Sequence, residues 1–270
     1  LRYGGNRVSA FTSIMRGCNY ACTYCVVPFT RGPERSRSVA SILQEVKKLA
    51  EQGYKEVTLL GQTVDSYAWK EPSGKEVPFS ALLEQVAIAV PDLRVRFATS
   101  HPHDMTEDVL RVMATYPNVC HHIHLPVQSG ATSMLQRMKR RYTREEYLNQ
   151  IALIRKLLPD CSITTDIIAG FTGETQEEHE ATLSLMREVH FDLAYMFKYS
   201  ERPGTYAQRR LGDTVSEELK GERLQEIIDL QQQHSYESNL RDVGKTFEVL
   251  VEGFSHKSDA DLCGRNMQNR

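Results

Sequence analysis

Short apolar runs rich in β-branched residues alternate along the chain with stretches in which apolar residues recur every three to four positions. The runs predict strands, and the stretches predict helices that each turn one apolar face toward a sheet. The expected strands are residues 10–14, 56–60, 95–99, 122–127, 162–168 and 193–199. The expected helices are residues 42–51, 79–89, 107–116, 144–157 and 177–189.

This alternation predicts βαβ units with right-handed crossovers, and therefore a parallel sheet. The number of units favours an α/β fold of the partial (β/α)6 barrel type, because the closed barrel normally has about eight. In either form, ligands bind where the strands end at the carboxyl edge of the sheet. We expect this core to occupy residues 1–212.

The pattern changes after residue 212. Residues 215–240 predict one long polar helix, so residues 213–243 are expected to link the core to a separate C-terminal segment. Gly244 ends this helix, and residues 246–251 have the composition of a strand. Residues 244–270 therefore predict the opening part of a small β-domain, too short to bury a core by itself. The apolar positions of the long helix are Leu219, Leu224, Ile227, Ile228 and Leu230.

Composition narrows the class of protein. The 270 residues are 40% apolar and 25% charged, which is ordinary for a globular chain. The net charge of -2 gives no overall basic surface, so any nucleic acid has to bind at local patches. No apolar run reaches the roughly 18 residues of a membrane span. We expect a cytoplasmic protein, favour a monomer, and expect a segment to be missing before Leu1, where no secretory signal precedes the first strand.

The strongest chemical signal lies just after the first predicted strand, where Cys18, Cys22 and Cys25 occur in one short segment. Three thiolates at this spacing suit one face of an iron–sulfur cluster, and the lack of a fourth nearby cysteine leaves one iron open. Two alternatives remain. Offsets of four and three also place the three side chains on one helical face as core, and a zinc site with a distant fourth ligand uses the same residues. Their crowding argues against a disulfide framework and for a reducing compartment.

This cysteine spacing, with Tyr24 just before the last cysteine, resembles the radical S-adenosylmethionine (SAM) superfamily. The resemblance implies a [4Fe–4S] cluster held by the three cysteines, whose open iron chelates the amino and carboxylate groups of SAM. It further implies that an electron from the cluster yields a 5′-deoxyadenosyl radical. The remaining task of the protein is then placement and the exclusion of water.

Further segments resemble the methylthiotransferases within that superfamily, from about Val8 to the end of the chain. Those segments are residues 26–32, 36–37, 59–62, 124–130 and 166–171. Residues 26–32 and 59–62 most resemble the branch that acts on N6-isopentenyladenosine in tRNA, and not the branches that act on a ribosomal protein or on threonylcarbamoyl-adenosine. This implies methylthiolation at C2 of N6-isopentenyl(dimethylallyl)adenosine beside the anticodon, with tRNA, an electron donor and a sulfur source as partners. The same chemistry on a ribosomal protein or on threonylcarbamoyl-adenosine, and a non-enzymatic zinc-binding RNA module, are the alternatives.

The chain departs from the family pattern at Thr63, Ala131, Ser38 and Thr172, where Asn, Ser, Pro and Pro are usual. None of these removes a cluster ligand, but Thr63 is expected to alter a polar contact near the substrate. The family also carries an N-terminal domain with a second [4Fe–4S] cluster, and a C-terminal RNA-binding TRAM domain. We expect the first to be absent here and residues 244–270 to begin the second.

Five residues are candidates for binding SAM. Tyr24 can lie against adenine, and Gln62 and Ser129 come after strands at the expected ligand edge. Asp166 lies within a strand, where a carboxylate needs a partner such as ribose hydroxyls. Arg140 can pair with the SAM carboxylate. Four of them have a plainer reading: a core aromatic for Tyr24, a solvated amide for Gln62, an arginine partner for Asp166, and a solvated charged face for Arg140.

The candidate RNA contacts are Arg31, Arg35 and Arg37, just after the cysteine segment, because clustered arginines commonly bind phosphates. A second arginine group at residues 202–210 is expected to lie near the same edge. A reacting base has to be unstacked to reach the chemistry. The histidines at residues 121–124 suggest a metal site only weakly, since histidines on strands are more often core or surface residues.

Overall fold

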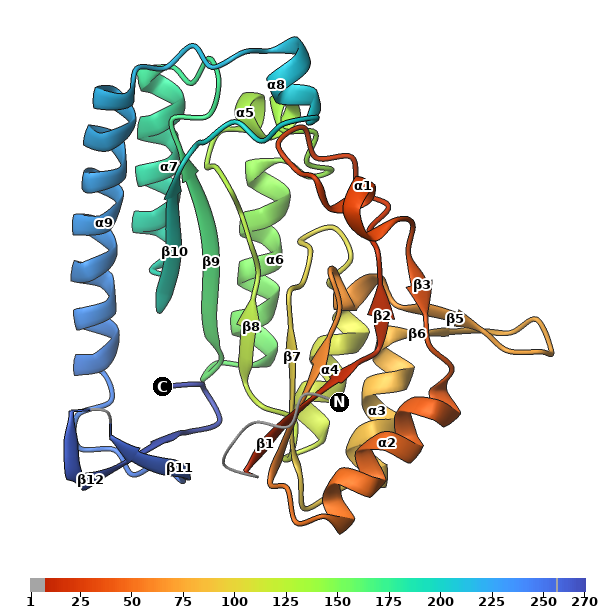
Figure 1. Cartoon of the computed structure of the whole chain (residues 1–270). Helices are drawn as coiled ribbons and strands as arrows, with labels where there is room; N and C mark the ends of the chain where they lie inside the picture. Colours follow the sequence, from red (N-terminus) through yellow and green to blue (C-terminus); the bar gives the residue numbers. More distant parts are fainter. Residues whose placement is uncertain (1–7, 256) are drawn as a thin grey trace.

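The computed structural model describes residues 8–255 and 257–270 (Figure 1). Its centre consists of two three-stranded parallel sheets, in the order β1-β4-β7 and β8-β9-β10. A single parallel bridge between Val95 and Val119 joins them, so six strands succeed one another in chain order. No closed barrel forms among the described residues, because β1 and β10 are not paired with each other. The predicted partial (β/α)6 barrel is confirmed.

The central strands agree closely with the sequence prediction, except where a proline intervenes. The fourth strand ends at His124 rather than at residue 127. Pro126 lies in the segment that was expected to extend it, and a proline cannot donate to a strand ladder. The six strands are β1 (Ser9–Ser13), β4 (Glu56–Leu60), β7 (Arg94–Ala98), β8 (His122–His124), β9 (Ser162–Ala169) and β10 (Leu193–Lys198).

Helices cover one side of the two sheets (Figure 1). On the other side, Arg96 of β7 donates to the carbonyls of Asn266 and Met267 near the C-terminus. The apolar stripes of the helices pack on the strands, as Ile42, Val46 and Leu49 of α2 do. Thr143 and Thr175 each begin a helix with a capping box, α6 and α7 respectively. The covering helices are α2 (Val39–Glu51), α3 (Phe79–Ala89), α4 (Glu107–Thr115), α6 (Arg144–Leu157) and α7 (Gln176–Val189).

Short elements complete the connections between strands and helices. They are β2 (Met15–Arg16), α1 (Val27–Arg31), β3 (Arg35–Ser36), η1 (Val64–Ser66), β5 (Ala68–Lys70), β6 (Glu76–Pro78), α5 (Thr132–Arg137) and α8 (Tyr206–Arg210). Figure 1 places α1, α5 and α8 together at one end of the molecule, beyond the carboxyl ends of the central strands. No helix of the described residues is long and apolar enough to cross a membrane.

The long helix α9 (Glu217–Leu240) packs along α7 and β10 with a buried face that is mainly polar. Of the five expected apolar positions, only Ile227 is fully buried. The buried polar side chains find specific partners: Arg223 pairs with Glu174 at 3.0 Å, and Gln231 donates to the Phe191 carbonyl at 2.9 Å. The predicted long polar helix is thus present, and Leu224 and Leu230 also pack, partly buried, against the core.

The chain ends in an antiparallel hairpin at the base of the sheets, β11 (Leu250–Ser255) with β12 (Ser258–Arg265). The strand predicted at residues 246–251 is displaced, since residues 246–249 are not in a strand. The hairpin is fixed through Glu56, a fully buried carboxylate that lies 2.6 Å from Arg96 Nε and 2.5 Å from Arg265 Nη2. The domain boundaries expected at residues 212 and 243 stay predictions.

Candidate functional site

The three cysteines lie in a loop between β2 and α1, at the carboxyl end of the strands (Figure 1). Gly17 opens this loop with a φ of 81°, which favours glycine. A Cβ at this position would lie 2.1 Å from the Pro33 carbonyl oxygen, so a larger residue does not fit. The sequence Arg16-Gly17-Cys18 thus turns the chain directly from a strand into the loop.

Neighbouring elements fix this loop by backbone contacts. Gly17 N donates to the Gln62 side chain at 3.1 Å, and Cys18 N donates to the Gly32 carbonyl at 3.1 Å. Thr23 donates through its N–H to the Met138 carbonyl at 3.1 Å and accepts from Ala207 N at 2.8 Å. The loop is therefore attached to the ends of β4, α5 and α8 together.

All three cysteines are free thiols; Cys22 is buried and the other two are half-buried. Burial raises the pKa of the Cys18 and Cys25 thiols, while backbone N–H groups oppose this by donating to the sulfurs. The Thr63 side chain also hydrogen-bonds to Cys18, so this departure from the family pattern lies against the cysteine loop.

Arg140 supplies positive charge to the loop. Its Nη1 lies 3.4 Å from Cys22 Sγ, its Nη2 donates to the Pro126 carbonyl at 3.2 Å, and its Nε donates to the Tyr142 hydroxyl at 3.0 Å. These contacts hold the Arg140 guanidinium directly against the sulfur of Cys22.

A cavity of about 470 Å³ opens beside the loop. It is lined by residues of the cysteine segment, by β9 and β10, and by the loop after β8. Aromatic rings give it stacking surfaces, Asp166 and Gln128 give it polar groups, and Arg202 gives it a positive charge. The full lining is Tyr24, Cys25, Val26, Val27, Gln128, Asp166, Ile168, Phe197, Lys198, Tyr199, Ser200 and Arg202.

The structure brings three of the five residues expected to contact SAM to the cavity or the cysteine loop, and the other two do not line the cavity. Tyr24 and Asp166 line the cavity, and Arg140 lies on Cys22. Gln62 does not line it, because its side-chain oxygen accepts from the cysteine loop instead. Ser129 is fully buried, and its hydroxyl lies 3.3 Å from Thr182 Oγ1 of α7. Its expected contact with SAM therefore has no support in the geometry.

Gln128 is the lining residue that the sequence reasoning missed. Its φ of 70° is unusual for a residue other than glycine and costs on the order of 1 kcal/mol. Its backbone is fixed to β9 on both sides, since its N–H donates to the Asp166 carbonyl at 2.8 Å and its carbonyl accepts from Ile168 N at 3.0 Å. The sequence indicated that residues 128–130 follow a strand at the ligand edge of the sheet. Which of their side chains faces the cavity depends on the φ of Gln128.

The glycine-rich loop after β9 packs against α9 rather than opening freely. Glu174 accepts from Gly170 N at 2.8 Å and pairs with Arg223, and both carboxylate and guanidinium are buried. A Cβ on Gly170 would lie 2.4 Å from the Lys220 side chain. A glycine is thus required at this position because α9 approaches closely. The next residue, Phe171, packs edge-on against Tyr24 with ring centroids 6.2 Å apart.

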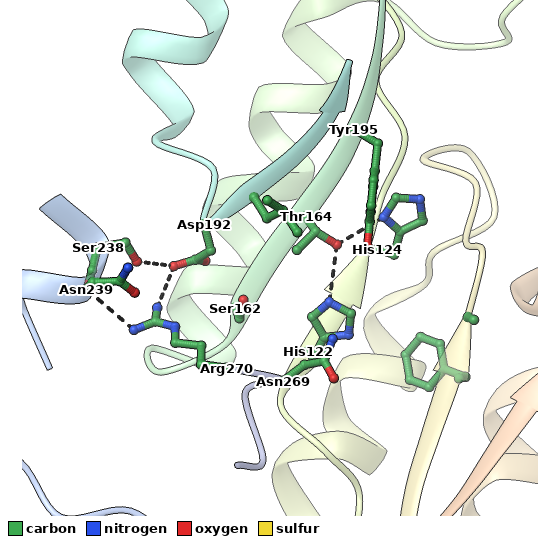
Figure 2. Close-up of a pocket in the computed structure, with 13 residues that line it drawn as sticks. His122, His124, Ser162, Thr164, Asp192, Tyr195, Ser238, Asn239, Asn269 and Arg270 are labelled. Atoms are coloured by element: carbon green, nitrogen blue, oxygen red, sulfur yellow. Dashed lines mark hydrogen bonds and ion pairs between the residues drawn. The ribbon is translucent and has the colours of Figure 1, made fainter. Parts of the chain in front are cut away.

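Figure 2 shows a second cavity, of about 280 Å³, further down the same strands. His122 and His124 share one face of β8, as expected, and both lie within hydrogen-bond distance of Thr164 Oγ1, at 3.2 and 3.0 Å. His124 also lies 3.4 Å from the Asp166 carboxylate, so it links the two cavities. His121 points elsewhere, toward Asp160.

The three arginines expected to contact RNA differ in their exposure and in their contacts with the rest of the fold. Arg31 and Arg35 are exposed on α1 and β3. Arg37 is held by the Ser13 carbonyl at 2.6 Å and by Glu45 at 2.8 Å, so its guanidinium is engaged within the fold. Phe29, 70% exposed, adds an aromatic surface on α1, the helix that also carries the exposed Arg31.

The residues around the cavity suit an iron–sulfur cluster and an adenosine ligand. The donors are soft thiols next to a cation and to N–H groups, and the Tyr199 hydroxyl is buried without a hydrogen-bond partner in the part of the chain that the structure describes. Within residues 8–255 and 257–270, no three histidine, cysteine or acidic side chains could hold one metal ion. A [4Fe–4S] cluster offers each thiolate a separate iron, so its ligands need not converge on one point.

Comparison with known proteins agrees with this geometry. The profile of the Radical SAM superfamily matches residues 12–186, which include the cysteine loop and the strands that line the cavity. The chain belongs to the radical SAM superfamily. Membership of this superfamily supports SAM and a [4Fe–4S] cluster as the cofactors.

Curated relatives of the radical SAM domain share one description. A tRNA-2-methylthio-N(6)-dimethylallyladenosine synthase of Phocaeicola vulgatus is 60% identical over 269 residues, and one of Bacteroides thetaiotaomicron is 58% identical over 269. Each alignment covers 100% of this chain and 59% of the relative. The chain therefore spans well under two thirds of the length of these relatives.

Solved structures resemble the domain in fold. Coproporphyrinogen III oxidase (HemN) from Escherichia coli gives a TM-score of 0.60 at 17% identity, covering 86% of this chain and 54% of that one. The methyltransferase TsrM from Kitasatospora setae, with cobalamin and a [4Fe-4S] cluster bound, gives 0.59 at 18% identity, covering 78% and 41%.

Proposed function

We propose that this chain is the radical SAM core of a tRNA methylthiotransferase that modifies C2 of N6-dimethylallyladenosine beside the anticodon. The observation that carries the proposal is the placement of Cys18, Cys22 and Cys25 in one fixed loop against a cavity of about 470 Å³. The 58–60% identity to the two synthases named above supports the substrate class.

Cys18, Cys22 and Cys25 would hold a [4Fe–4S] cluster with one open iron. When bound, the cluster supplies the electron that cleaves SAM to a 5′-deoxyadenosyl radical. Arg140 stabilises negative charge at Cys22, and Tyr24 covers the cavity from the loop side and limits the access of water. Asp166 is placed to accept hydrogen bonds from ribose hydroxyls of an adenosine ligand.

The target base has to leave its stack to reach the cavity, because C2 of adenine is shielded between neighbouring bases. Arg31 and Arg35 provide exposed positive charge for backbone phosphates, and Phe29 provides a ring on which a base can stack. Arg202 continues this positive charge into the cavity.

The whole reaction needs more than these residues. A second [4Fe–4S] cluster in a preceding domain, an electron donor and a sulfur source complete the proposal, and the greater length of the relatives leaves room for such a domain. We propose a cytoplasmic monomer, in keeping with a tRNA substrate.

An anaerobic assay of 5′-deoxyadenosine tests the core of the proposal. The protein is reconstituted with iron and sulfide and then given SAM and a strong reductant. We expect about four irons per chain at this site and formation of the nucleoside, neither of which Cys22→Ala should show. Cys263→Ala is the matched control, because Cys263 is exposed in the hairpin and far from the loop in sequence. A zinc-loaded, colourless protein without SAM cleavage contradicts the proposal.

The substrate is tested separately with the full-length protein. We expect mass spectrometry of nucleosides to show the 2-methylthio product from tRNA that carries N6-dimethylallyladenosine. Transfer to a ribosomal protein or to threonylcarbamoyl-adenosine, with no product from this tRNA, refutes the substrate while leaving the radical chemistry standing.

A further inference from the structure

The short ribbon formed by β2 and β3 places two arginines directly opposite each other. The pairing is antiparallel, and its register sets Arg16 against Arg35. Directly opposed residues of such a pair share one face, with Cβ atoms about 5 Å apart. Both arginines are exposed, and neither guanidinium has a hydrogen bond or an ion pair with any residue that the structure describes. Like charges in this position destabilise a ribbon, so the pair is unfavourable unless an anion binds both groups.

The acidic side chain closest in sequence does not neutralise this pair. Glu34 immediately precedes Arg35, but its carboxylate is occupied by other donors. One oxygen accepts from Asn19 N at 3.2 Å and from the Ser66 hydroxyl at 3.1 Å, and the other accepts from Asn19 Nδ2 at 3.1 Å. The positive charge of the ribbon is therefore left uncompensated.

The neighbouring ribbon of β5 and β6 shows the ordinary arrangement of charges. There the register sets Lys70 against Glu76, and both residues are exposed. Opposite charges directly across an antiparallel pair are favourable. The two ribbons are joined, since Ala68 N donates to the Ser36 hydroxyl at 3.1 Å. The like-charged pair is thus a feature of one ribbon and not of this whole surface.

The β2–β3 ribbon is also the stem of the cysteine loop. Arg16 stands two residues before Cys18, and Figure 1 shows β2 and β3 side by side next to α1. The stem is held firmly, because Arg37 N donates to the Ile14 carbonyl at 2.8 Å and the Tyr67 hydroxyl donates to the Arg37 carbonyl at 2.6 Å. Two cations presented from a fixed backbone lose little freedom when they bind a common anion.

A guanidinium offers a planar fork of N–H donors that fits a phosphate, and two forks from adjacent strands can bind the same phosphate. We propose that Arg16 and Arg35 together bind one backbone phosphate of the RNA substrate. This deepens the proposed function and rests on it, because it takes RNA as the partner. Phosphate contacts of this kind fix the register of a nucleic acid on a protein. Here the bound phosphate holds the RNA at the stem of the cysteine loop.

The test is a double-mutant cycle between Arg16 and single RNA phosphates. The full-length protein is reconstituted with its cluster and titrated with an anticodon-type hairpin that carries N6-dimethylallyladenosine. Further hairpins each replace one phosphate by an uncharged methylphosphonate. Arg16→Gln and Arg35→Gln, singly and together, are compared with the wild type. Lys70→Gln is the matched control, because it removes one exposed positive charge from the neighbouring ribbon.

We expect each single arginine variant to bind the hairpin roughly tenfold more weakly, and the double variant to lose little more, since both groups bind one phosphate. One methylphosphonate should weaken binding to the wild type by a similar factor and leave binding to Arg16→Gln unchanged. The slope of log affinity against log salt should fall by about 0.7 to 0.9 in the double variant, as for one phosphate. Losses no larger than that of Lys70→Gln, or no phosphate coupled to Arg16, indicate a diffuse charged surface and overturn the inference.

Thermal unfolding without RNA tests the premise that the pair is unfavourable. Arg16→Gln removes the repulsion, so its melting temperature should equal or exceed that of the wild type. Lys70→Gln removes a favourable pair, so its melting temperature should not rise. A lower melting temperature for Arg16→Gln contradicts the premise and overturns the inference; an unchanged or higher one shows that lost RNA binding does not reflect unfolding.

Binding requires no turnover, which separates this inference from the proposed function. If the protein forms no 2-methylthio product while one phosphate stays coupled to Arg16, the proposed function fails and the inference stands. If the product forms and no phosphate is coupled to Arg16, the inference fails and the proposed function stands.

Discussion

Substitution of Glu56, whose carboxylate is buried, is the most stringent test of how the hairpin is held to the core. The Glu56 side chain is fully buried and faces two guanidinium groups, Arg96 at 2.6 Å and Arg265 at 2.5 Å, and the Arg96 side chain is itself only 4% exposed. Glu56→Gln keeps the shape but removes the negative charge. It therefore leaves the Arg96 charge buried without its carboxylate partner.

Removing one partner of a buried ion pair costs about 3–5 kcal/mol. We expect the lower end of this range, because Arg96 keeps its hydrogen bonds to the carbonyls of Asn266, at 2.6 Å, and Met267, at 3.2 Å. For a chain of this size that loss lowers the melting temperature by roughly 6 to 12 °C. Thermal unfolding followed by circular dichroism measures it.

An exposed pair provides the matched control. Glu107→Gln breaks the pair with Arg111 on α4, in which both side chains are about half exposed, so the cost should stay below about 0.5 kcal/mol. A double variant, Glu56→Gln with Arg96→Met, should recover stability, since no buried charge then lacks a partner. If Glu56→Gln lowers the melting temperature no more than Glu107→Gln does, the argument from the buried charge is refuted.

Two further predictions concern the cysteine loop and acid stability. Gly17→Ala should lower iron loading strongly, because a Cβ there would lie 2.1 Å from the Pro33 carbonyl oxygen. Gly74→Ala is the control, since Gly74 has a φ of 87° but a Cβ there would have no atom within 4 Å. Equal iron content in the two variants contradicts the reasoning. Lys220 and Lys198 lower the pKa of Glu217 from 4.5 to about 2, so this carboxylate stabilises the fold above pH 4.5 and its contribution is lost as the pH falls toward 2. Glu217→Gln should remove that part of the acid dependence of the melting temperature, and an unchanged profile refutes the assignment.

The sequence was sufficient for the strands because each is a short run rich in apolar and β-branched residues, as residues 57–60 of β4 are. The cysteine loop was also predictable, since its residue types belong to one kind of chemistry. The buried face of α9 was not, because Arg223 and Gln231 are buried only by virtue of partners on other elements. Hydrophobic periodicity identifies the apolar positions of a helix, but it does not reveal that Glu174, on another element, supplies a carboxylate partner.

Site residues were predictable to the element but not to the side chain. In the loop after β8, Ser129 was expected as a contact, but it is buried and its neighbour Gln128 lines the cavity. The alternation of a strand gives no guidance beyond His124, since Gln128 has a positive φ. The side chains of Gln62 and Arg37 are both engaged by the chain itself.

The polar contacts of α9 also set a spacing. Its 24 residues extend over roughly 36 Å, from the end of the molecule near the cysteine loop to the hairpin at the base (Figure 1). Adding or deleting one residue would turn everything beyond it by about 100° and separate Arg223 from Glu174 or Gln231 from the Phe191 carbonyl. These contacts therefore fix the length of α9. Anything bound by the hairpin is held at a constant distance from the cavity.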